Sequence, residues 1–177
     1  MTPDLAARIR ARLRDVPDFP KPGIVFKDIT PLLGDAPLFR EVTEALAQPF
    51  ANAGVTHVAA IDSRGFLLGA PVAQHLGAAL VPLRKPGKLP AATHHESYAL
   101  EYGSDALEMH TDAMPAGAVV LVVDDVLATG GTAAAACALV ERAGARVAGV
   151  ALLMELAVLN GRSRLPGRHI SSLVTFS

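Results

Sequence analysis

The sequence predicts an α/β fold with a mostly parallel central sheet and helices on both faces. Two features of the 177-residue chain point to it. Short apolar runs alternate with segments of helical periodicity, which is the pattern of a parallel sheet with right-handed crossovers. One run, Val119-Val120-Leu121-Val122-Val123, is entirely apolar, as expected for a strand buried on both faces. At this length we expect a single domain with an ample core.

The first elements follow from spacing and from helix breakers. Residues 3–14 are predicted to form a helix, because Leu5, Ile9 and Leu13 recur every four residues with arginines on the other faces. The proline-rich segment 16–23 is expected to break regular structure, and residues 24–28 to form a short extended piece. An amphipathic helix over residues 37–53 precedes the first strand of the alternating pattern, residues 55–61.

The remaining elements continue this alternation. We expect a helix over residues 67–76, a short strand over 80–83, a polar loop over 91–97, and a hairpin over 98–110 that turns at Gly103-Ser104-Asp105. A helix running to about residue 143 follows the central stretch. Strands at 147–154 and 172–176, with a polar, basic segment at 160–168 between them, complete the chain.

The central stretch, residues 119–132, carries the clearest functional pattern. Its strand leads into the small-residue loop Ala128-Thr129-Gly130-Gly131-Thr132 and then into a helix. The first N–H groups of a helix have no partner within the helix and favour an anion, so this layout suits a phosphate group. Thr132 is expected to cap the helix. The Walker and dinucleotide-binding signatures are both absent.

Two carboxylates, Asp124 and Asp125, stand where the strand is expected to end. They would repel a triphosphate, but a carboxylate can accept hydrogen bonds from both hydroxyls of a sugar diol. The stretch therefore predicts a ribose 5-phosphate site, with the diol on the aspartates and the phosphate on residues 128–132.

Other residues remain open to two interpretations when taken alone. Arg64, in the loop Asp62-Ser63-Arg64, could bind phosphate as a fork or form a structural ion pair. The cations Arg84, Lys85 and Lys88 could collect a pyrophosphate or belong to a solvated loop. Phe26 could stack on a planar base, although most phenylalanines lie in a core. In parallel sheets ligands bind beyond the carboxyl ends of the strands, where these loops would converge.

Composition excludes several classes of function. The formal net charge is −1, which gives no basic surface for nucleic acid. The single cysteine, Cys137, excludes an internal disulfide and suits a reducing, cytoplasmic compartment. We expect neither a signal peptide nor a membrane span. The adjacent His94 and His95 have no neighbours at metal-ligand spacing, so we expect no protein-ligated metal.

The chain resembles the adenine phosphoribosyltransferases, a branch of the type I phosphoribosyltransferase family, over nearly its whole length. The residues that carry the resemblance are DFPKPGIVFKDITPLL, DSRGFLLGAPVA, RKPGKLP, YALEYGSDALEMH, DAMPAGAVVLVVDDVLATGGT and ELAVLNGRSRL. The central stretch marks the phosphoribosyl pyrophosphate (PRPP) motif of the wider family. The segments PGIVFKD, RKPGKLP and LEYG are specific to the adenine enzymes.

The resemblance implies a role for each matching position. Val25, Phe26 and Lys27 would form the adenine pocket, with Phe26 stacking on the ring, and Leu156 or Leu159 would cover the base. Asp62, Ser63 and Arg64 would form a pyrophosphate loop, often with a non-proline cis peptide, and Arg84, Lys85 and Lys88 would contact pyrophosphate. Glu101 would exchange a proton at the purine N7, beside Tyr102 on a closing loop. The PRPP site would comprise Asp124, Asp125, Val126, Leu127, Ala128, Thr129, Gly130, Gly131 and Thr132.

The implied activity is purine salvage, in which adenine and PRPP give AMP and pyrophosphate. Mg2+ would be held through substrate and water rather than by protein ligands, and the enzyme would be a cytoplasmic homodimer. Within one domain spanning residues 1–177, residues 1–35 would form a hood and residues 84–110 a flexible catalytic loop. Two alternatives remain: a sister transferase for another base such as xanthine or orotate, and a non-catalytic PRPP-sensing regulator.

Overall fold

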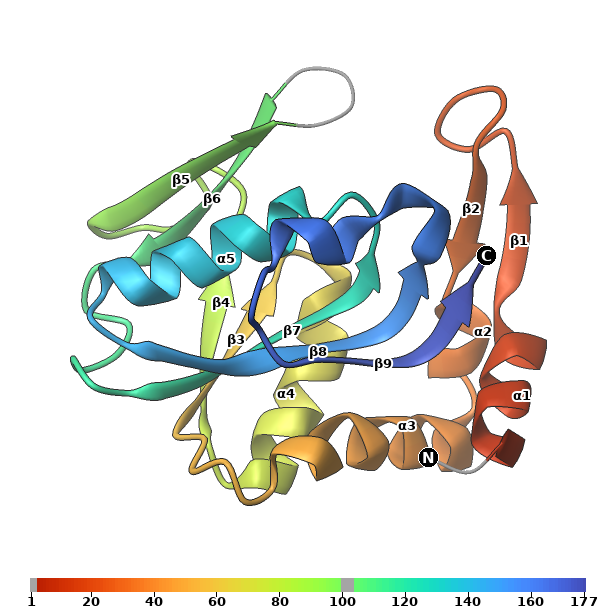
Figure 1. Ribbon diagram of the computed structural model, residues 1–177, viewed down its shortest axis with the longest axis horizontal. Helices are drawn as coiled ribbons and strands as arrows, with labels where there is room; N and C mark the ends of the chain where they lie inside the picture. Colours follow the sequence, from red (N-terminus) through yellow and green to blue (C-terminus); the bar gives the residue numbers. More distant parts are fainter. Residues whose placement is uncertain (1–2, 100–103) are drawn as a thin grey trace.

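A parallel sheet organises the molecule. The computed structural model describes residues 3–99 and 104–177. Along the chain the elements are α1 (Pro3–Arg12), β1 (Arg14–Pro17), β2 (Val25–Asp28), α2 (Thr30–Leu33), α3 (Ala36–Ala47), the 3-10 turn η1 (Gln48–Phe50), β3 (His57–Ile61), α4 (Arg64–Leu76), β4 (Ala79–Leu83), β5 (Thr93–Ala99), β6 (Ser104–His110), β7 (Val119–Leu127), α5 (Gly131–Arg142), β8 (Arg146–Leu156), the 3-10 turns η2 (Ala157–Leu159) and η3 (Gly161–Arg164), and β9 (Ile170–Phe176). Figure 1 shows these elements along the chain.

The described residues form a five-stranded parallel sheet in the order β4-β3-β7-β8-β9. From β3 the chain moves outward to β4 and then returns to β7 on the other side of β3. The direction of winding therefore reverses between β3 and β7, and ligands of open α/β sheets bind at such a switch point, beyond the strand ends. Two antiparallel ribbons, β1–β2 and β5–β6, rise on either side of this end of the sheet (Figure 1).

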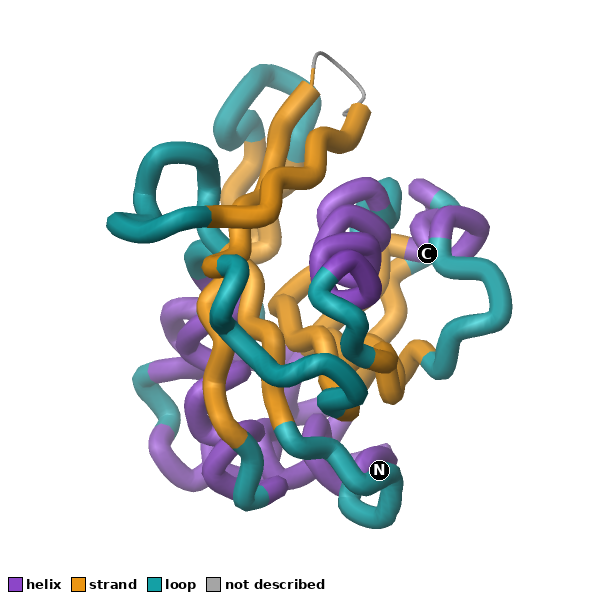
Figure 2. The backbone as a smooth tube through the Cα atoms, turned by 90° about the vertical axis from the view of Figure 1, so that its left-hand side faces the viewer, coloured by secondary structure: helices purple, strands orange, loops and turns teal. Residues whose placement is uncertain are grey.

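The apolar run of β7 explains why helices pack on both faces of the sheet. Successive strand residues point to opposite faces, so Val120 and Val122 pack in one core cluster with α5 and the β5–β6 ribbon, whereas Leu121 and Val123 pack in another with α1, α3 and α4. All four side chains are fully buried, and each contributes about 1.5–3 kcal/mol relative to an exposed position. Figure 2 shows helices on both faces of the strands, which confirms the predicted fold class. Among the helices of residues 3–99 and 104–177, none has the length and apolar run needed to cross a bilayer.

Two sequence predictions of irregular segments were wrong in part. The segment expected to break regular structure contains the end of β1, because Val16 pairs with Phe26 across the β1–β2 ribbon and Pro17 is its last residue. The polar loop expected over residues 91–97 mostly belongs to β5, which contains His94 and His95. Pairing with β6 and burial of Leu107 and Met109 against α5 outweigh the polar local sequence.

The turn and helix starts also differ from the prediction. Ser104 and Asp105, expected in the hairpin turn, belong to β6 instead, whereas Gly103 lies outside the described residues. The helix α4 begins at Arg64 rather than at Leu67. The N-cap of α5 is Gly130, with φ of 82°, and Thr132 lies one residue inside the helix. The prediction of Thr132 as cap was therefore wrong: the left-handed backbone at Gly130 starts the helix earlier.

Candidate active site

The two aspartates lie inside β7 rather than after it. The predicted strand ended at Val123, but pairing with β8 continues from Asp124, opposite Leu152, to Leu127, opposite Glu155. Val126 packs on the α3–α4 side and Leu127 on the α5 side, the reverse of the alternation set by Val122 and Val123. The two-residue repeat is therefore broken at the segment that carries both carboxylates.

The carboxylates have different surroundings. Asp125 is 3% exposed, and its Oδ2 lies 2.9 Å from Nη2 of Arg64 at the start of α4. Asp124 is half-buried, opens into a cavity, and accepts a hydrogen bond of 2.9 Å from the Asp125 backbone N–H. Burial raises the pKa of both groups; the neighbouring Asp125 charge raises that of Asp124 further, while Arg64 opposes the rise at Asp125. The site therefore carries an excess of negative charge that a ligand with hydroxyl donors would relieve.

The cavity beside Asp124 has a volume of about 150 Å³ and is enclosed by the loop before α5. It is lined by Asp124, Val126, Leu127, Ala128, Thr129, Gly130, Thr132 and Ala133. Thr132 and Ala133, in the first turn of α5, also line the cavity. The first N–H groups of a helix have no partner within it, so one wall offers donors for an anion and another a carboxylate for hydroxyls. The predicted loop and Asp124 thus enclose one space.

A second cavity, of about 140 Å³, adjoins the first. It is mostly apolar and is lined by Ile24, Val25, Phe26, Lys27, Arg64, Val126, Ala128, Met154 and Leu156. Val126 and Ala128 line both cavities. Leu156 belongs to the lining, whereas Leu159, 39% exposed, does not. A flat apolar ring in this cavity would lie directly beside a sugar phosphate in the other.

Arg64 lines the apolar cavity and reaches Asp125, the residue next to Asp124. Its guanidinium lies 4.6 Å from the centre of the Phe26 ring, and Nη1 donates to the Lys27 carbonyl at 3.2 Å, while Nη2 faces Asp125. The side chain of Lys27 pairs with Asp15 at 2.6 Å, so Lys27 presents backbone to the cavity. Phe26 is half-buried and its ring meets Phe19 edge-on at 5.0 Å. It is therefore a cavity wall rather than a fully buried core residue.

The cations after β4 converge on Asp62, at the end of β3. Arg84 Nε lies 3.4 Å and Lys88 Nζ 3.7 Å from the Asp62 carboxylate, and the backbone N–H of Lys85 donates to it at 3.3 Å. The Asp62–Ser63 peptide is cis. The side chain of Lys85 instead contacts Asp105 and the hydroxyl of Tyr98, in the β5–β6 ribbon. The side chains of Arg84 and Lys88 thus lie beside the Asp62 loop.

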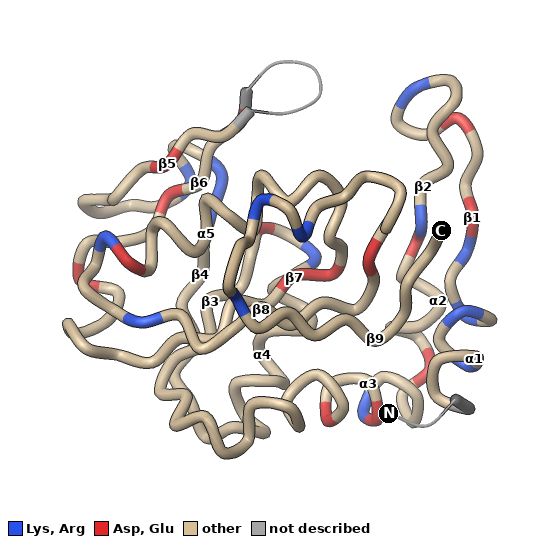
Figure 3. Tube along the Cα trace, viewed as in Figure 1, with Lys and Arg blue, Asp and Glu red and all other residues tan. Residues whose placement is uncertain are grey.

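Figure 3 shows the resulting charge pattern, with an acidic segment in β7 and basic positions on the segments beside it. Glu101 and Tyr102 lie outside the described residues. Across residues 3–99 and 104–177 no group of three or more His, Cys, Asp or Glu side chains is arranged to hold a metal ion.

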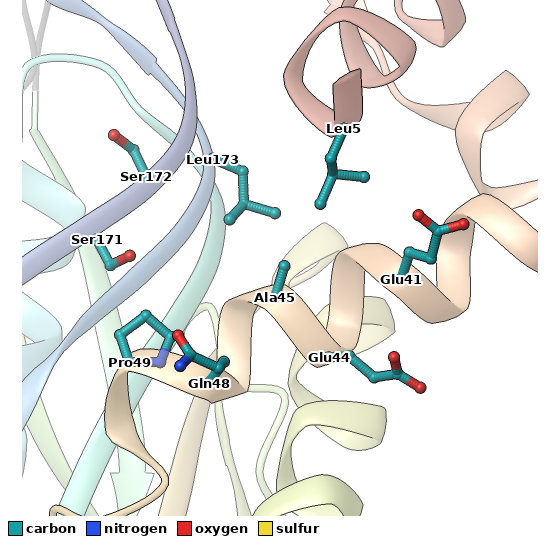
Figure 4. A pocket seen from close by; sticks show the side chains of 9 residues that line it. All are labelled: Leu5, Glu41, Glu44, Ala45, Gln48, Pro49, Ser171, Ser172 and Leu173. Atoms are coloured by element: carbon teal, nitrogen blue, oxygen red, sulfur yellow. The ribbon is translucent and has the colours of Figure 1, made fainter. Parts of the chain in front are cut away.

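A larger cavity, of about 480 Å³, lies elsewhere, between α1, α3 and β9 (Figure 4). Figure 4 labels its lining, which includes Glu41, Glu44, Ser171 and Ser172. Both oxygens of Glu41 already accept hydrogen bonds from Arg8 at 2.8 Å. Its carboxylates would repel a sugar phosphate, and size alone does not make this cavity the candidate site.

Sequence reasoning missed several residues around the site. Ile24 and Met154 line the apolar cavity, but in the sequence each is one apolar residue among many. Tyr98 and Asp105 hold Lys85 across a distance that no local pattern reveals. The signal that could have located Met154 is its place near the carboxyl end of β8, the strand beside β7.

Comparisons of sequence and of structure with known proteins agree on one family. Residues 32–170 match the model of the phosphoribosyl transferase domain. The adenine phosphoribosyltransferase of Myxococcus xanthus is 56% identical over 172 residues, 97% of this chain and 94% of its own. The crystal structure of the Rhodothermus marinus enzyme superimposes with a TM-score of 0.95 at 51% identity and covers 99% of this chain and 100% of its own.

The Saccharomyces cerevisiae adenine phosphoribosyltransferase, solved in complex with an imino-altritol bisphosphate and adenine, has a TM-score of 0.91 at 39% identity, covering 97% of this chain and 99% of its own. Similarity of this extent, in sequence and in fold, covers nearly the whole chain. The chain belongs to the adenine phosphoribosyltransferase family.

Proposed function

We propose that the protein transfers a 5-phosphoribosyl group from PRPP to adenine, giving AMP and pyrophosphate, as the purine-salvage relatives named above imply. The observation that carries this proposal is the pair of adjoining cavities with Val126 and Ala128 as shared walls. One is apolar and suits a purine; the other joins a helix N-terminus to a carboxylate and suits a ribose 5-phosphate.

Residues 128–132 hold the 5′-phosphate in this proposal, and Asp124 and Asp125 accept hydrogen bonds from the ribose diol. Fixing both ends of the sugar aligns its C1′ with the base cavity, which lowers the entropic part of the barrier. As the bond from C1′ to pyrophosphate loosens, positive charge develops on the sugar. The buried carboxylates, which now lack enough positive partners, stabilise that charge.

The base lies between Phe26 and Leu156, with the backbone at Val25 and Lys27 reading its amino edge. Val126 and Met154, which also line the base cavity, contribute further contacts. N9 of adenine forms the new bond to C1′, pyrophosphate leaves with the electron pair of the old bond, and Glu101, beside Tyr102, exchanges a proton at N7. Asp62, Ser63, Arg64, Arg84, Lys85 and Lys88 bind the departing pyrophosphate.

Magnesium is proposed to enter the site bound to PRPP. The donors beside the cavities are carboxylate oxygens, which suit a hard cation, but they do not form a cage of three or more ligands among the described residues. We propose that Mg2+ is held by PRPP oxygens and water near Asp124 and Asp125. When bound, it would neutralise part of the pyrophosphate charge.

We also propose that the enzyme acts in the cytoplasm as a homodimer. The buried Cys137, whose pKa burial raises to about 11, fits a reducing compartment in which no disulfide is needed. The exposed apolar side chains Leu67 and Leu80, 48% and 46% exposed, leave surface for a second copy.

Release of pyrophosphate tests the reaction directly. Protein, PRPP and Mg2+ are mixed with adenine, guanine, hypoxanthine, xanthine or orotate in separate reactions. We expect kcat/KM for adenine to exceed that for each other base by at least about 10²-fold. A base with a different hydrogen-bonding edge would leave polar groups in the base cavity without partners, which raises the free energy of the transition state. Faster turnover with another base would identify a sister transferase. No release with any base, despite PRPP binding, would favour the non-catalytic regulator.

A further inference from the structure

The segment after β8 is held against the end of that strand by an ion pair. Arg162, in η3, forms a fork on Glu155: Nε lies 2.8 Å and 3.0 Å from the two carboxylate oxygens, and Nη2 lies 2.7 Å from Oε2. Ser172 of β9 donates to the same Oε2 at 3.2 Å. The Glu155 side chain is 8% exposed and that of Arg162 is 47% exposed, so the carboxylate is shielded from water while the guanidinium partly faces it.

The residue before Arg162 touches the phosphate loop. A Cβ on Gly161 would stand 2.3 Å from the Ala128 carbonyl oxygen, and a Cβ on Gly130 would stand 2.3 Å from the Gly161 carbonyl oxygen. The two backbones therefore pack without any side chain between them. Leu165, 2% exposed, anchors the far end of the segment in the α5-side core.

We propose that Glu155, Arg162 and Ser172 are positioning residues, which hold Gly161 against residues 128–130 and thereby fix the phosphate loop in the shape that binds ribose 5-phosphate. This inference rests on the proposed function and deepens it. We call Glu155, Arg162 and Ser172 the brace. Neither the brace residues nor Gly161 line the cavity beside Asp124, so the brace acts on the loop by holding the Gly161 backbone against Ala128 and Gly130.

The energetics favour such a role. Removing Arg162 leaves a shielded carboxylate without its main partner, and the segment must then move to let water reach it. A loop that binds a phosphate through backbone N–H groups tolerates little displacement, because hydrogen bonds weaken steeply with distance and angle. A shift of about 1 Å at such a site is enough to cost a large factor in binding or rate.

The test uses Arg162→Met, which keeps much of the side-chain length but removes the fork. The dissociation constant of ribose 5-phosphate is measured by calorimetry, well below the melting temperature of each variant. In the reverse reaction the KM of pyrophosphate is measured at saturating AMP. We expect the dissociation constant of ribose 5-phosphate to rise about tenfold and the KM of pyrophosphate to stay within about twofold. The Asp62 loop is held by contacts with Arg84, Lys85 and Lys88, which this substitution leaves in place.

Further variants separate positioning from a general loss of structure. Glu155→Gln, which keeps an acceptor for Arg162, should lie between wild type and Arg162→Met in its affinity for ribose 5-phosphate. Gly161→Ala, which forces a Cβ against Ala128, should weaken ribose 5-phosphate binding as Arg162→Met does. The matched control is Glu141→Gln, which removes the carboxylate of another Arg–Glu contact, 3.0 Å from Arg168 near the end of α5, and should change neither constant.

The outcomes are distinct. If Arg162→Met unfolds at a lower temperature but binds ribose 5-phosphate as wild type does, or if both constants rise together, the positioning role is refuted while the proposed function stands. If Arg162→Met cannot be purified folded, Glu155→Gln and Gly161→Ala decide by the same two constants. If wild type binds no ribose 5-phosphate, the proposed function fails and this inference fails with it.

Discussion

At the scale of single residues, Asp124 and Asp125 are placed at a cost to stability. Both carboxyl groups have pKa values raised by burial, so the folded protein holds their protons more tightly than the unfolded chain does. Between the ordinary value of 3.8 and the raised value, stability therefore falls as pH rises. A ligand that donates hydroxyls to these oxygens would recover part of this loss, which fits a binding site rather than a structural ion pair.

This reasoning predicts an opposed effect of Asp124→Asn on stability and activity. The free energy of unfolding at neutral pH should rise by about 0.5–2 kcal/mol, and its decline with rising pH should flatten. The kcat with adenine and PRPP should fall by at least about 10²-fold. Denaturant titrations from pH 4 to pH 8 and steady-state kinetics measure the two effects. The exposed Asp112→Asn is the control and should change neither; a destabilised Asp124→Asn would contradict this interpretation of the site.

Glu101 lies outside the described residues, and its role stays a prediction. If it exchanges a proton at N7, Glu101→Ala should lower kcat by about 10²-fold or more while the KM of PRPP changes little. Stopped-flow measurement of AMP formation separates this chemical step from product release. Turnover like that of wild type would remove Glu101 from the mechanism.

At the scale of elements, the helix α4 brings Arg64 to the site by packing closely on β3. A Cβ on Gly69 would stand 2.5 Å from the Cβ of Ala60, a distance that real side chains do not reach. Glycine at this position lets the helix lie near the strand, and its first turn then places the guanidinium of Arg64 between Phe26 and Asp125.

We therefore predict that Gly69→Ala lowers stability, although alanine is the better helix former by about 1 kcal/mol. Overpacking costs about 1–3 kcal/mol, so the net effect should be a lower melting temperature by a few degrees. Gly34→Ala is the matched control: its φ is −76° and its nearest contacts are ordinary ones at 3.7 Å, so it should be neutral or slightly stabilising. A Gly69→Ala protein that melts with or above wild type would show that the helix can shift freely.

Element types were predictable from the sequence where the pattern was strong, and their ends were not. The apolar run before Asp124 predicts a buried strand, but pairing with β8 carries β7 on to Leu127. Likewise, no local signal distinguishes the polar residues His94 and His95 from a loop, because the partners that make them a strand lie in β6. Tertiary pairing decides such boundaries.

The candidate site was likewise predictable from the sequence only in part. Motif order is enough to predict that residues 128–132 and Asp124 belong together, since strand, loop and helix are consecutive. Contacts between segments that lie far apart in the sequence could not be predicted in this way. The link from Arg64 to the Lys27 carbonyl, and the link from Arg162 to Glu155, depend on how elements pack, and no spacing in the chain encodes them.

At the scale of the whole molecule, the two ribbons stand on either side of the carboxyl end of the sheet (Figure 1). The N-terminal ribbon supplies Val25, Phe26 and Lys27 to the base cavity, and the other ribbon holds Lys85 through Tyr98 and Asp105. The hood over residues 1–35 and the catalytic loop over 84–110 remain proposals for these two parts. The N-terminal ribbon reaches the site through Arg64, which contacts the Phe26 ring and the Lys27 carbonyl, and the other ribbon reaches the Asp62 loop through Lys85.

The proposed homodimer can be tested by measuring its mass in solution. Light scattering during size-exclusion chromatography should give twice the 18.4 kDa of one chain, since the exposed Leu67 and Leu80 favour burial against a second copy. Leu67→Lys should weaken the association if α4 contributes to the interface. A mass of one chain at micromolar concentration would contradict the dimer without affecting the proposed reaction.

The most direct test of the central claim is a crystal structure with AMP bound. We predict that the 5′-phosphate lies within hydrogen-bond distance of the backbone N–H groups of residues 129–132, the ribose diol faces Asp124 and Asp125, and the adenine ring lies against Phe26. A nucleotide bound elsewhere, for example in the cavity between α3 and β9, or one whose phosphate lies in the apolar cavity, would contradict the account.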